Sequence, residues 1–344
     1  MVKQKMKILF ISHKFYPDIG GIEVNSELLA NQFIALGAEI KIVTWSKNLG
    51  EKKFEYEVIR KPSLRELLKL FRWSDLIYEN NPTVRLSWLN VFFKKPRVVA
   101  IRTWIRQNNS KITFVHLFKK KWVNNATQVI AISEAIKRDT SNKGIVIGNP
   151  YRSELFKSNT DRNLRVKDFI FLGRLVSDKG ADMCVELLNQ LKTKYNIECN
   201  LSIIGEGPEM ESLKNNSIKY KLEKNIYFSG FLKGQDLVNE LNKHKYILVP
   251  SRWEEPFGNV VLEGMACGCI PITSDGGGLP DAVGNAGIIF KRNSIEDLTD
   301  KTYELLTNSM QQKSLLDNSE AHLANHTEKK VGLRYFDVIV KAYN

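Results

Sequence analysis

The sequence predicts an α/β protein with two Rossmann-like domains, each built on a doubly wound parallel sheet. Its 344 residues exceed the size at which a single hydrophobic core usually stops growing, so two domains are expected. Short apolar runs alternate with longer stretches of helical periodicity along the whole chain, which is typical of parallel strands covered by helices. The composition, 43% hydrophobic and 26% charged residues, is that of a globular protein.

The first half of the chain opens this alternation. Its clearest helical pattern covers residues 22–36, which follow a strongly apolar run. Its predicted strands cover residues 7–12, 39–45, 54–60, 76–79, 97–102, 128–133 and 145–147.

The second half repeats the same rhythm after a polar stretch at residues 151–167, which we interpret as a linker. The predicted domains therefore cover residues 1–155 and 165–328, and a final helix with seven apolar residues follows at about 329–344. The predicted strands cover residues 169–173, 200–205, 227–229, 246–250, 270–273 and 287–290. The predicted helices cover residues 181–195, 209–220, 235–243 and 259–267.

The net charge of +13 is concentrated in the first half. Residues 1–150 hold 26 Lys and Arg against 12 Asp and Glu, whereas residues 151–344 hold 25 against 26. A basic domain attracts anionic partners such as a membrane leaflet or an anionic acceptor. Nucleic acid is not expected, because no nucleic-acid-binding motif accompanies the charge.

Two segments of the basic half, residues 88–95 and 114–122, interleave aromatic and long apolar residues with lysines. This pattern fits a helix in a membrane interface, and equally a core-packing helix with solvated lysine ends. No segment approaches the roughly 18 consecutive apolar residues of a membrane span, and the first residues lack a secretion signal. We therefore expect a cytoplasmic protein, peripheral on the inner face of the cytoplasmic membrane. The four cysteines lack metal-binding spacing and are expected to be buried free thiols.

The most informative segment is residues 253–268, where Glu255 and Glu263 stand eight positions apart. Pro256 and the glycines predict a loop that turns into a helix, and the apolar residues that follow predict that this helix is largely buried. A carboxylate in such a helix is costly unless a polar group meets it, so Glu263 needs a partner, and a ligand hydroxyl would serve.

The start of the same helix favours an anion, because its exposed backbone N–H groups lie near Glu255. The residues at this start are Gly258, Asn259 and Val260. Eight residues of loop and helix span on the order of 12 Å, roughly the distance from a sugar ring to a nucleotide ribose. The layout predicts a nucleotide-sugar site; the alternative is an ordinary helix with one surface and one core-edge glutamate.

With the preceding Pro-Ser from Pro250 onward, this segment resembles the E-x7-E signature of retaining glycosyltransferases with the GT-B fold, family 4 in particular. The resemblance implies two facing Rossmann-like domains, with the final helix packed back on the first. It also implies that Glu255 lies at the donor sugar and that Glu263 binds the ribose hydroxyls.

A second motif, residues 171–180, follows a strand and opens a helix. Arg174 and Lys179 can both reach the carboxyl edge of the sheet, where doubly wound folds bind ligands, and two cations there would neutralise a diphosphate. The resemblance implies that they bind the donor diphosphate and stabilise the leaving group. The alternative is a surface Arg and Lys at the start of a helix.

Further candidates follow strand ends. Gly20 and Gly21 allow close approach of a ligand, although the G-x-G-x-x-G fingerprint is absent. The resemblance implies that they meet the donor phosphates or the acceptor, and that Gly205 and Phe231 line the nucleotide-base pocket. His13 lies near the glycine loop as an acceptor-side candidate without a catalytic role.

Arg102 marks a departure from the family, because many relatives carry a histidine after the equivalent strand. An arginine does not act as a general base, so Arg102 would bind a phosphate or an anionic sugar acceptor instead.

No D-x-D sequence and no metal-type spacing occur, so neither a metal nor another cofactor is expected. We predict a retaining, metal-independent transferase that moves a sugar from a UDP-sugar, or next a GDP-sugar, to a glycan or lipid-linked acceptor. The expected setting is bacterial cell-surface polysaccharide or lipopolysaccharide synthesis. The alternatives are a nucleotide-sugar epimerase of the same fold and a non-catalytic nucleotide-sugar-binding protein.

Overall fold

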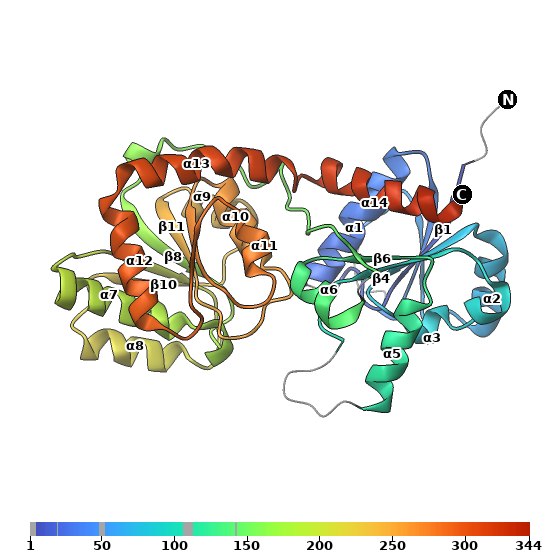
Figure 1. Cartoon of the computed structure of the whole chain (residues 1–344), viewed down its shortest axis with the longest axis horizontal. Coiled ribbons are helices and arrows are strands. Elements are labelled where there is room, and N and C mark those ends of the chain that lie inside the picture. Colours follow the sequence, from blue (N-terminus) through green and yellow to red (C-terminus); the bar gives the residue numbers. More distant parts are fainter. Residues whose placement is uncertain (1–4, 19, 48–51, 106–112, 142) are drawn as a thin grey trace. The chain divides into compact units, whose positions relative to one another are not determined.

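A computed structural model describes residues 5–18, 20–47, 52–105, 113–141 and 143–344 (Figure 1). The chain divides into two compact units, the first formed by residues 1–150 and 328–344 and the second by residues 151–327. Residues 1–4, at the start considered above for a secretion signal, lie outside the described residues.

The first unit is built on a seven-stranded parallel sheet with the order β3-β2-β1-β4-β5-β6-β7. Its strands are β1 (Lys7–Ser12), β2 (Glu39–Thr44), β3 (Glu57–Arg60), β4 (Leu76–Asn80), β5 (Arg97–Ile101), β6 (Gln128–Ala131) and β7 (Ile145–Val146). Its helices are α1 (Gly21–Ala35), α2 (Leu64–Trp73), α3 (Val84–Ser87), α4 (Asn90–Phe93), α5 (Phe114–Asn124), α6 (Glu134–Thr140) and α14 (Glu328–Tyr343).

Both faces of this sheet are buried, as the apolar strands predict. Successive side chains of β1 alternate between two cores: Ile8 and Phe10 pack on the side of α1 and α14, and Leu9 and Ile11 pack on the side of α2. The last helix, α14, lies so close to α1 that a Cβ added at Gly332 would be 2.5 Å from the Cβ of Gln32. The carboxyl-terminal residues are therefore part of the first unit.

The second unit is built on a six-stranded parallel sheet with the order β10-β9-β8-β11-β12-β13. Its strands are β8 (Lys167–Leu172), β9 (Leu201–Ile204), β10 (Ile226–Gly230), β11 (His244–Val249), β12 (Ile270–Ser274) and β13 (Ile288–Phe290). Its α-helices are α7 (Ala181–Tyr195), α8 (Met210–Lys219), α9 (Gly234–Leu241), α10 (Asn259–Ala266), α11 (Leu279–Val283), α12 (Ile295–Thr307) and α13 (Ser309–Ala324). Two 3₁₀ turns, Arg162–Leu164 and Ser177–Lys179, complete it.

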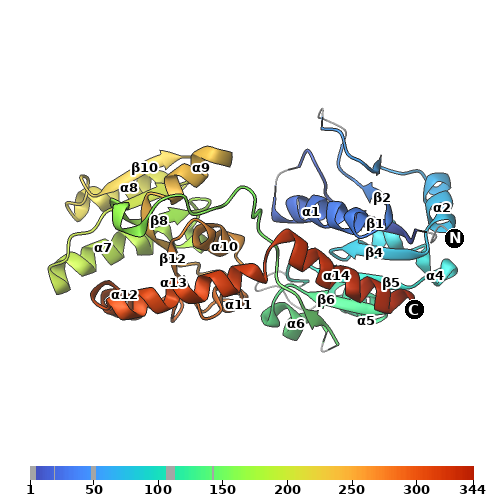
Figure 2. The same ribbon diagram turned by 90° about the horizontal axis from the view of Figure 1, so that it is seen from above.

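The two sheets share one topology, and Figures 1 and 2 show helices on both sides of each. In each unit the strand order runs outward in both directions from a central pair, β1 and β4 in the first and β8 and β11 in the second. The predicted α/β fold class with two Rossmann-like parallel-sheet domains is confirmed. In such sheets ligands bind at the carboxyl ends of the strands, at the switch point where the order reverses.

Three details differ from the sequence predictions. The strand predicted at 54–60 begins only at Glu57, because Phe54 and Tyr56 stack on each other and on Phe15 instead of joining the sheet. The segment 88–95 follows α3, which ends at Ser87, and contains the short α4, with Leu89 buried and Phe92 exposed. Segment 114–122 forms α5, but most of its apolar side chains are exposed, so the core-packing alternative for it is wrong.

All four cysteines are buried and unpaired, as predicted from their spacing. Among the described residues, no helix is both long enough and apolar enough to cross a bilayer.

Candidate functional site

Two of the predicted donor residues of the second unit, Lys179 and Glu255, lie in the loops that follow β8 and β11, which end side by side at the switch point of the sheet. After β8 the chain passes through Arg174 and the 3₁₀ turn to Gly180, where α7 begins. Gly180 has a φ of 72°, and a Cβ there would lie 2.2 Å from the carbonyl oxygen of Pro250. Only glycine allows this close approach, which brings the loop after β8 against the loop after β11.

Backbone hydrogen bonds hold these two loops together. The N–H groups of Arg252 and Trp253 donate to the carbonyl oxygen of Asp178 at 2.8 and 3.1 Å. The N–H of Gly278 donates to the carbonyl oxygen of Glu255 at 2.7 Å, which ties in the loop after β12. Main-chain hydrogen bonds thus fix the two loops that carry Lys179 and Glu255.

The centre of the site is an ion pair between Lys179 and Glu255. Ser251 Oγ also donates to Glu255 Oε1 at 3.0 Å, and the Lys179 ammonium lies 5.3 Å from the centre of the Trp253 ring. Glu255 is only 9% exposed, so its charge is stabilised by these two donors rather than by water. The pair gives a fixed ammonium group at the carboxyl edge of the sheet.

Glu263 lies in the middle of α10 and is half-buried. Burial raises the pKa of its carboxyl to about 7, and the guanidinium of Arg152 acts in the opposite direction. The carboxyl makes no hydrogen bond or ion pair in the part of the chain that the structure describes. A desolvated acceptor of this kind can take hydrogen bonds from ligand hydroxyl groups.

Arg174 directly follows the strand end and is exposed. Its guanidinium forms no hydrogen bond or ion pair within the described ranges, unlike the ammonium of Lys179. Because five N–H donors are free to grip a phosphate bidentately, Arg174 can bind an anion without breaking an existing pair.

The sequence of this unit matches a known family. Residues 152–322, nearly all of the second unit, match the family described as "Glycosyl transferases group 1". This match covers just under half of the chain, and over this stretch the second unit is similar to the group 1 glycosyltransferases.

Named glycosyltransferases are also similar to this chain. An uncharacterized glycosyltransferase of Methanocaldococcus jannaschii is 30% identical over 209 residues, which are 59% of this chain and 56% of that protein. The gpi3 subunit of phosphatidylinositol N-acetylglucosaminyltransferase from Schizosaccharomyces pombe is 22% identical over 339 residues, covering 88% of this chain and 73% of that one. The crystal structure of Anabaena HepE in complex with UDP has a TM-score of 0.79 at 18% identity and covers 98% of this chain and 100% of HepE. This likeness shows that the chain has the GT-B fold.

The amino end of α10 has the features expected of the predicted anion position. Gly258 precedes the helix with a φ of 109°, and no side chain caps the helix through a hydrogen bond. Asn259 and Val260, both half-buried, form its first positions. These three residues remain candidates for binding the donor.

Gly205 and Phe231 follow β9 and β10. A Cβ at Gly205 would lie 1.8 Å from the carbonyl oxygen of Gly173, so the glycine is explained by the contact of two strand ends alone. Phe231 is 63% exposed directly after β10 and is available to stack on a base. The base-pocket prediction for both residues stays a prediction.

In the first unit, His13 and Gly20 follow β1, and Gly21 begins α1. His13 is exposed and uses its carbonyl oxygen, not its ring, to accept hydrogen bonds. A Cβ at Gly20 would lie 2.5 Å from Glu23 Oε2, so a buried carboxylate lies against the glycine loop. The negative charge of Glu23 beside the first turn of α1 would repel a phosphate there, which sequence reasoning did not anticipate.

Arg102 is only 4% exposed. It donates from Nε to Asn80 Oδ1 at 2.8 Å and from Nη1 to Asn149 Oδ1 at 2.7 Å, and its guanidinium lies 4.9 Å from the centre of the Tyr335 ring. Arg102 therefore ties the carboxyl ends of β4 and β5 to residue 149. Its predicted contact with an anionic acceptor remains a prediction.

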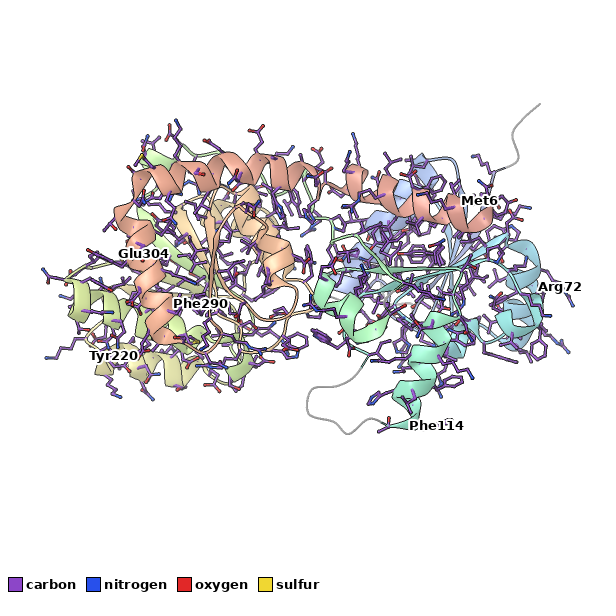
Figure 3. The ribbon with its side chains drawn as sticks, in the orientation of Figure 1. Met6, Arg72, Phe114, Tyr220, Phe290 and Glu304 are labelled. Carbon is purple, nitrogen blue, oxygen red and sulfur yellow. The ribbon has the colours of Figure 1, made fainter. Side chains whose placement is uncertain are left out.

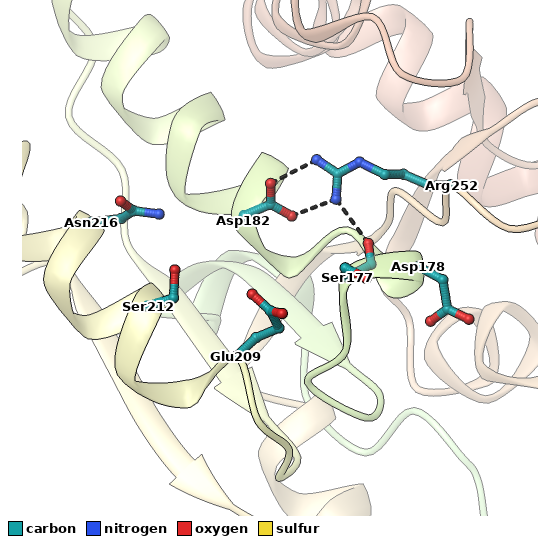
Figure 4. A pocket seen from close by; sticks show the side chains of 7 residues that line it. All are labelled: Ser177, Asp178, Asp182, Glu209, Ser212, Asn216 and Arg252. Atoms are coloured by element: carbon teal, nitrogen blue, oxygen red, sulfur yellow. Dashed lines mark hydrogen bonds and ion pairs between the residues drawn. The ribbon is translucent and has the colours of Figure 1, made fainter.

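A shallow cavity of about 350 Å³ is lined by residues of the loop after β8 and of helices α7 and α8, together with Arg252 (Figure 4). Arg252 bridges it by donating to both carboxylate oxygens of Asp182 at 2.6 Å and to the carbonyl oxygen of Ser177 at 2.9 Å. The other charged groups of its lining are the carboxylates of Asp178 and Glu209. Because these acids would repel a diphosphate, we do not assign the donor to this cavity.

Sequence reasoning assigned no role to three residues of the site: Ser251, Trp253 and Arg152. The first two lie inside the motif, and their position four and two residues before Glu255 was the available signal. Arg152 is 111 positions from Glu263, and no local pattern connects the two. Within the described residues, no group of three His, Cys, Asp or Glu side chains could hold a metal ion.

Proposed function

We propose that the protein is a retaining glycosyltransferase that transfers a sugar, without a metal ion, from a UDP-sugar to a glycan or lipid-linked acceptor. A GDP-sugar is the second choice of donor, and cell-surface polysaccharide or lipopolysaccharide synthesis in a bacterium is the proposed setting. The observation that carries the proposal is the ion-paired Lys179 at the switch point, with the unpaired groups of Arg174 and Glu263 in the same unit.

The charges of the site suit a departing nucleoside diphosphate. Arg174 and Lys179 supply two positive charges, which stabilise the negative charge that builds up on the leaving phosphate. These cations supply what a divalent ion would otherwise supply, which supports a metal-independent reaction. The carboxyl of Glu263 is suited to the two ribose hydroxyls, and Glu255 orients Lys179 and the donor sugar.

In the proposed front-face reaction, the bond between the sugar C1 and the phosphate oxygen breaks as a bond from C1 to the acceptor oxygen forms on the same face. The acceptor proton passes to an oxygen of the departing diphosphate. The protein then needs no side chain as nucleophile, and the configuration at C1 is kept.

The relatives support the choice of substrates. HepE has been crystallised with UDP and with UDP-glucose, and gpi3 is a subunit of an enzyme named for phosphatidylinositol and N-acetylglucosamine. The HepE ligands favour a uridine nucleotide as donor, and the name of the gpi3 enzyme favours an acceptor that is attached to lipid. The basic first half favours an anionic membrane surface as a further partner.

The first test is a thermal-shift panel with UDP, GDP, ADP, CMP and NAD, together with UDP- and GDP-sugars. A ligand at 100 times its dissociation constant is expected to stabilise the protein by about 2.7 kcal/mol. UDP should give the largest shift, and Glu263→Ala should reduce it while Glu304→Ala, a surface glutamate of α12, should not. A shift with NAD alone would contradict the proposal.

Incubation with the selected UDP-sugar then separates the three candidate functions. A transferase releases UDP, slowly with water as acceptor; an epimerase converts the sugar without releasing UDP; a binding protein does neither. The anomeric configuration of the product, observed by NMR, tests retention, and unchanged turnover in EDTA tests metal independence.

A further inference from the structure

Helix α5 of the first unit has its apolar face turned outward. Phe114, Val115, Leu117 and Phe118 are 81%, 56%, 56% and 46% exposed, and Val123 is the only buried residue of the helix. Lys119 and Lys120, by contrast, are partly covered by the protein. A surface helix of a globular protein normally shows the opposite arrangement, with apolar residues inward and lysines outward.

The exposed face is held on a fixed helix. At the carboxyl end of α5, Trp122 Nε1 donates to Glu79 Oε1 at 3.3 Å, and the Arg97 guanidinium lies 4.3 Å from the Trp122 ring and 2.8 Å from the same carboxylate. At the amino end, Thr113 and His116 form a reciprocal capping box. Figures 1 and 3 show the helix leading away from the sheet, with Phe114 at its far end. The apolar residues are therefore displayed by a helix that is anchored at one end and capped at the other.

The stretch of sequence that contains this face is strongly basic. Residues 80–133 contain ten Lys and Arg and no Asp or Glu, although 38 acids in 344 residues would place about six in a stretch of this length. Lys119 and Lys121 form no ion pair with any described residue. Lys120 forms one, with its Nζ 3.6 Å from Asp139 Oδ1. Two lysines of the helix that carries the apolar face are therefore left without an ion pair within the described residues.

We propose that α5 docks the first unit onto a bilayer containing anionic lipids. Phe114, Leu117 and Phe118 enter the boundary between headgroups and acyl chains, and Lys119 and Lys121 contact the lipid phosphates. The inference rests on the proposed function only for its purpose, which is to bring the enzyme to a lipid-linked acceptor.

Two other occupants fit the surface less well. A nucleic acid would match the lysines but leave the apolar side chains exposed to water. A second copy of the chain, related by a twofold axis, would set the lysines of one copy against those of the other. A bilayer with anionic headgroups satisfies both the apolar and the charged part of the surface.

The test is co-sedimentation of the full chain with vesicles, without donor or acceptor. Vesicles of phosphatidylcholine with about 30% phosphatidylglycerol should bind the protein, and vesicles of phosphatidylcholine alone should bind it weakly. Phe114→Ser/Phe118→Ser should lower the partition coefficient at least about tenfold. Lys119→Gln/Lys121→Gln should lower it about 25-fold, from about fivefold for each lysine near an anionic surface.

A matched control removes equally exposed apolar residues elsewhere. Val166 and Met310, in the second unit, are 79% and 82% exposed, and Val166→Ser/Met310→Ser should bind vesicles like the wild type. The thermal shift with UDP should be the same in all variants, which shows that each is folded and keeps its donor site.

Several outcomes would overturn the docking. Unchanged binding of the Phe114/Phe118 variant would mean that the contact is electrostatic only. Self-association in light scattering without lipid, lost in the same variant, would assign the face to a second copy. Binding to an oligonucleotide but not to vesicles would assign it to nucleic acid. A UDP shift without vesicle binding rejects the docking alone, whereas vesicle binding without any nucleotide shift rejects the proposed function alone.

Discussion

Replacement of Lys179 by alanine tests the centre of the proposed site, because it affects stability and turnover for different reasons. For stability, the change leaves Glu255 as a buried carboxylate with Ser251 as its remaining side-chain donor. Removing one partner of a fully buried ion pair costs about 3–5 kcal/mol. The side chains of Lys179 and Glu255 retain 20% and 12% exposure, so we expect a loss of about 2 kcal/mol. For a unit of this size that corresponds to a fall in Tm of about 4–8 °C.

For turnover, the same change removes a preorganised positive charge from the departing diphosphate. Loss of one such group typically costs about 10²–10³ in rate, which exceeds what a 2 kcal/mol loss of stability produces below the Tm. The assay is release of UDP from the UDP-sugar identified above, with water as acceptor until the natural acceptor is known. Thermal unfolding is followed on the same samples.

The double variant Lys179→Ala/Glu255→Gln separates the two effects. Neutralising the unpaired carboxylate should recover most of the lost Tm, and UDP release should stay low because the cation is still missing. If the double variant recovered both, Lys179 would serve only to balance Glu255. Near-native UDP release by Lys179→Ala itself would refute the assignment of Lys179 to the leaving group.

Four further predictions concern the same unit. The pKa of about 7 predicts that the Glu263 carboxyl ionises between pH 6 and 8 and that UDP binds more tightly as pH rises through this range. Calorimetric titration measures this affinity. In Glu263→Gln the affinity should change with pH only as the ionisation of UDP itself requires. The folded-state pKa is raised, so Glu263 also binds more protons when folded, and wild-type stability should decrease as pH rises from about 4.5 to 7 while that of Glu263→Gln should not. Arg174→Ala should weaken UDP binding at least about tenfold. Its Tm should not change, because the guanidinium forms no hydrogen bond or ion pair with a described residue. A fall in Tm without a change in affinity would contradict this. Gly180→Ala should lower both Tm and the affinity for UDP, because the added Cβ would lie 2.2 Å from the Pro250 carbonyl oxygen. Gly173→Ala is the control: this partly buried position would bring the new Cβ no closer than 3.3 Å to another side chain, so Tm should fall less.

Much of the fold follows from local sequence patterns. All six strands of the second sheet, and α7 from Ala181 to Tyr195, were predicted from apolar runs and helical periodicity, because parallel strands buried on both faces have few polar residues. The start of the strand predicted from Phe54 was wrong, because aromatic side chains can pack on each other as readily as they join a sheet.

The candidate site was predicted less completely. Glu255 and Lys179 could be named from their motifs, but their pairing joins residues 76 positions apart and depends on the meeting of two loops. Glu23 was missed because its carboxylate folds back on Gly20, which the pattern of alternating elements does not encode. The outward face of α5 was also beyond prediction, since periodicity shows that a helix has an apolar side but not which way that side is turned.

The chain enters and leaves the second unit at neighbouring points. The N–H of Tyr151 donates to the carbonyl oxygen of His326 at 3.0 Å, and Tyr151 pairs with Thr327 as in a parallel sheet. Entry and exit are therefore separated by about one strand spacing, ~5 Å. The second unit has the connectivity of an inserted module: residues 151–327 can be excised as one piece, and a linker of a few residues can rejoin residue 150 to residue 328. The second unit, for which we propose donor recognition, is thereby one continuous block of sequence that recombination can exchange, whereas the first unit is formed by two segments.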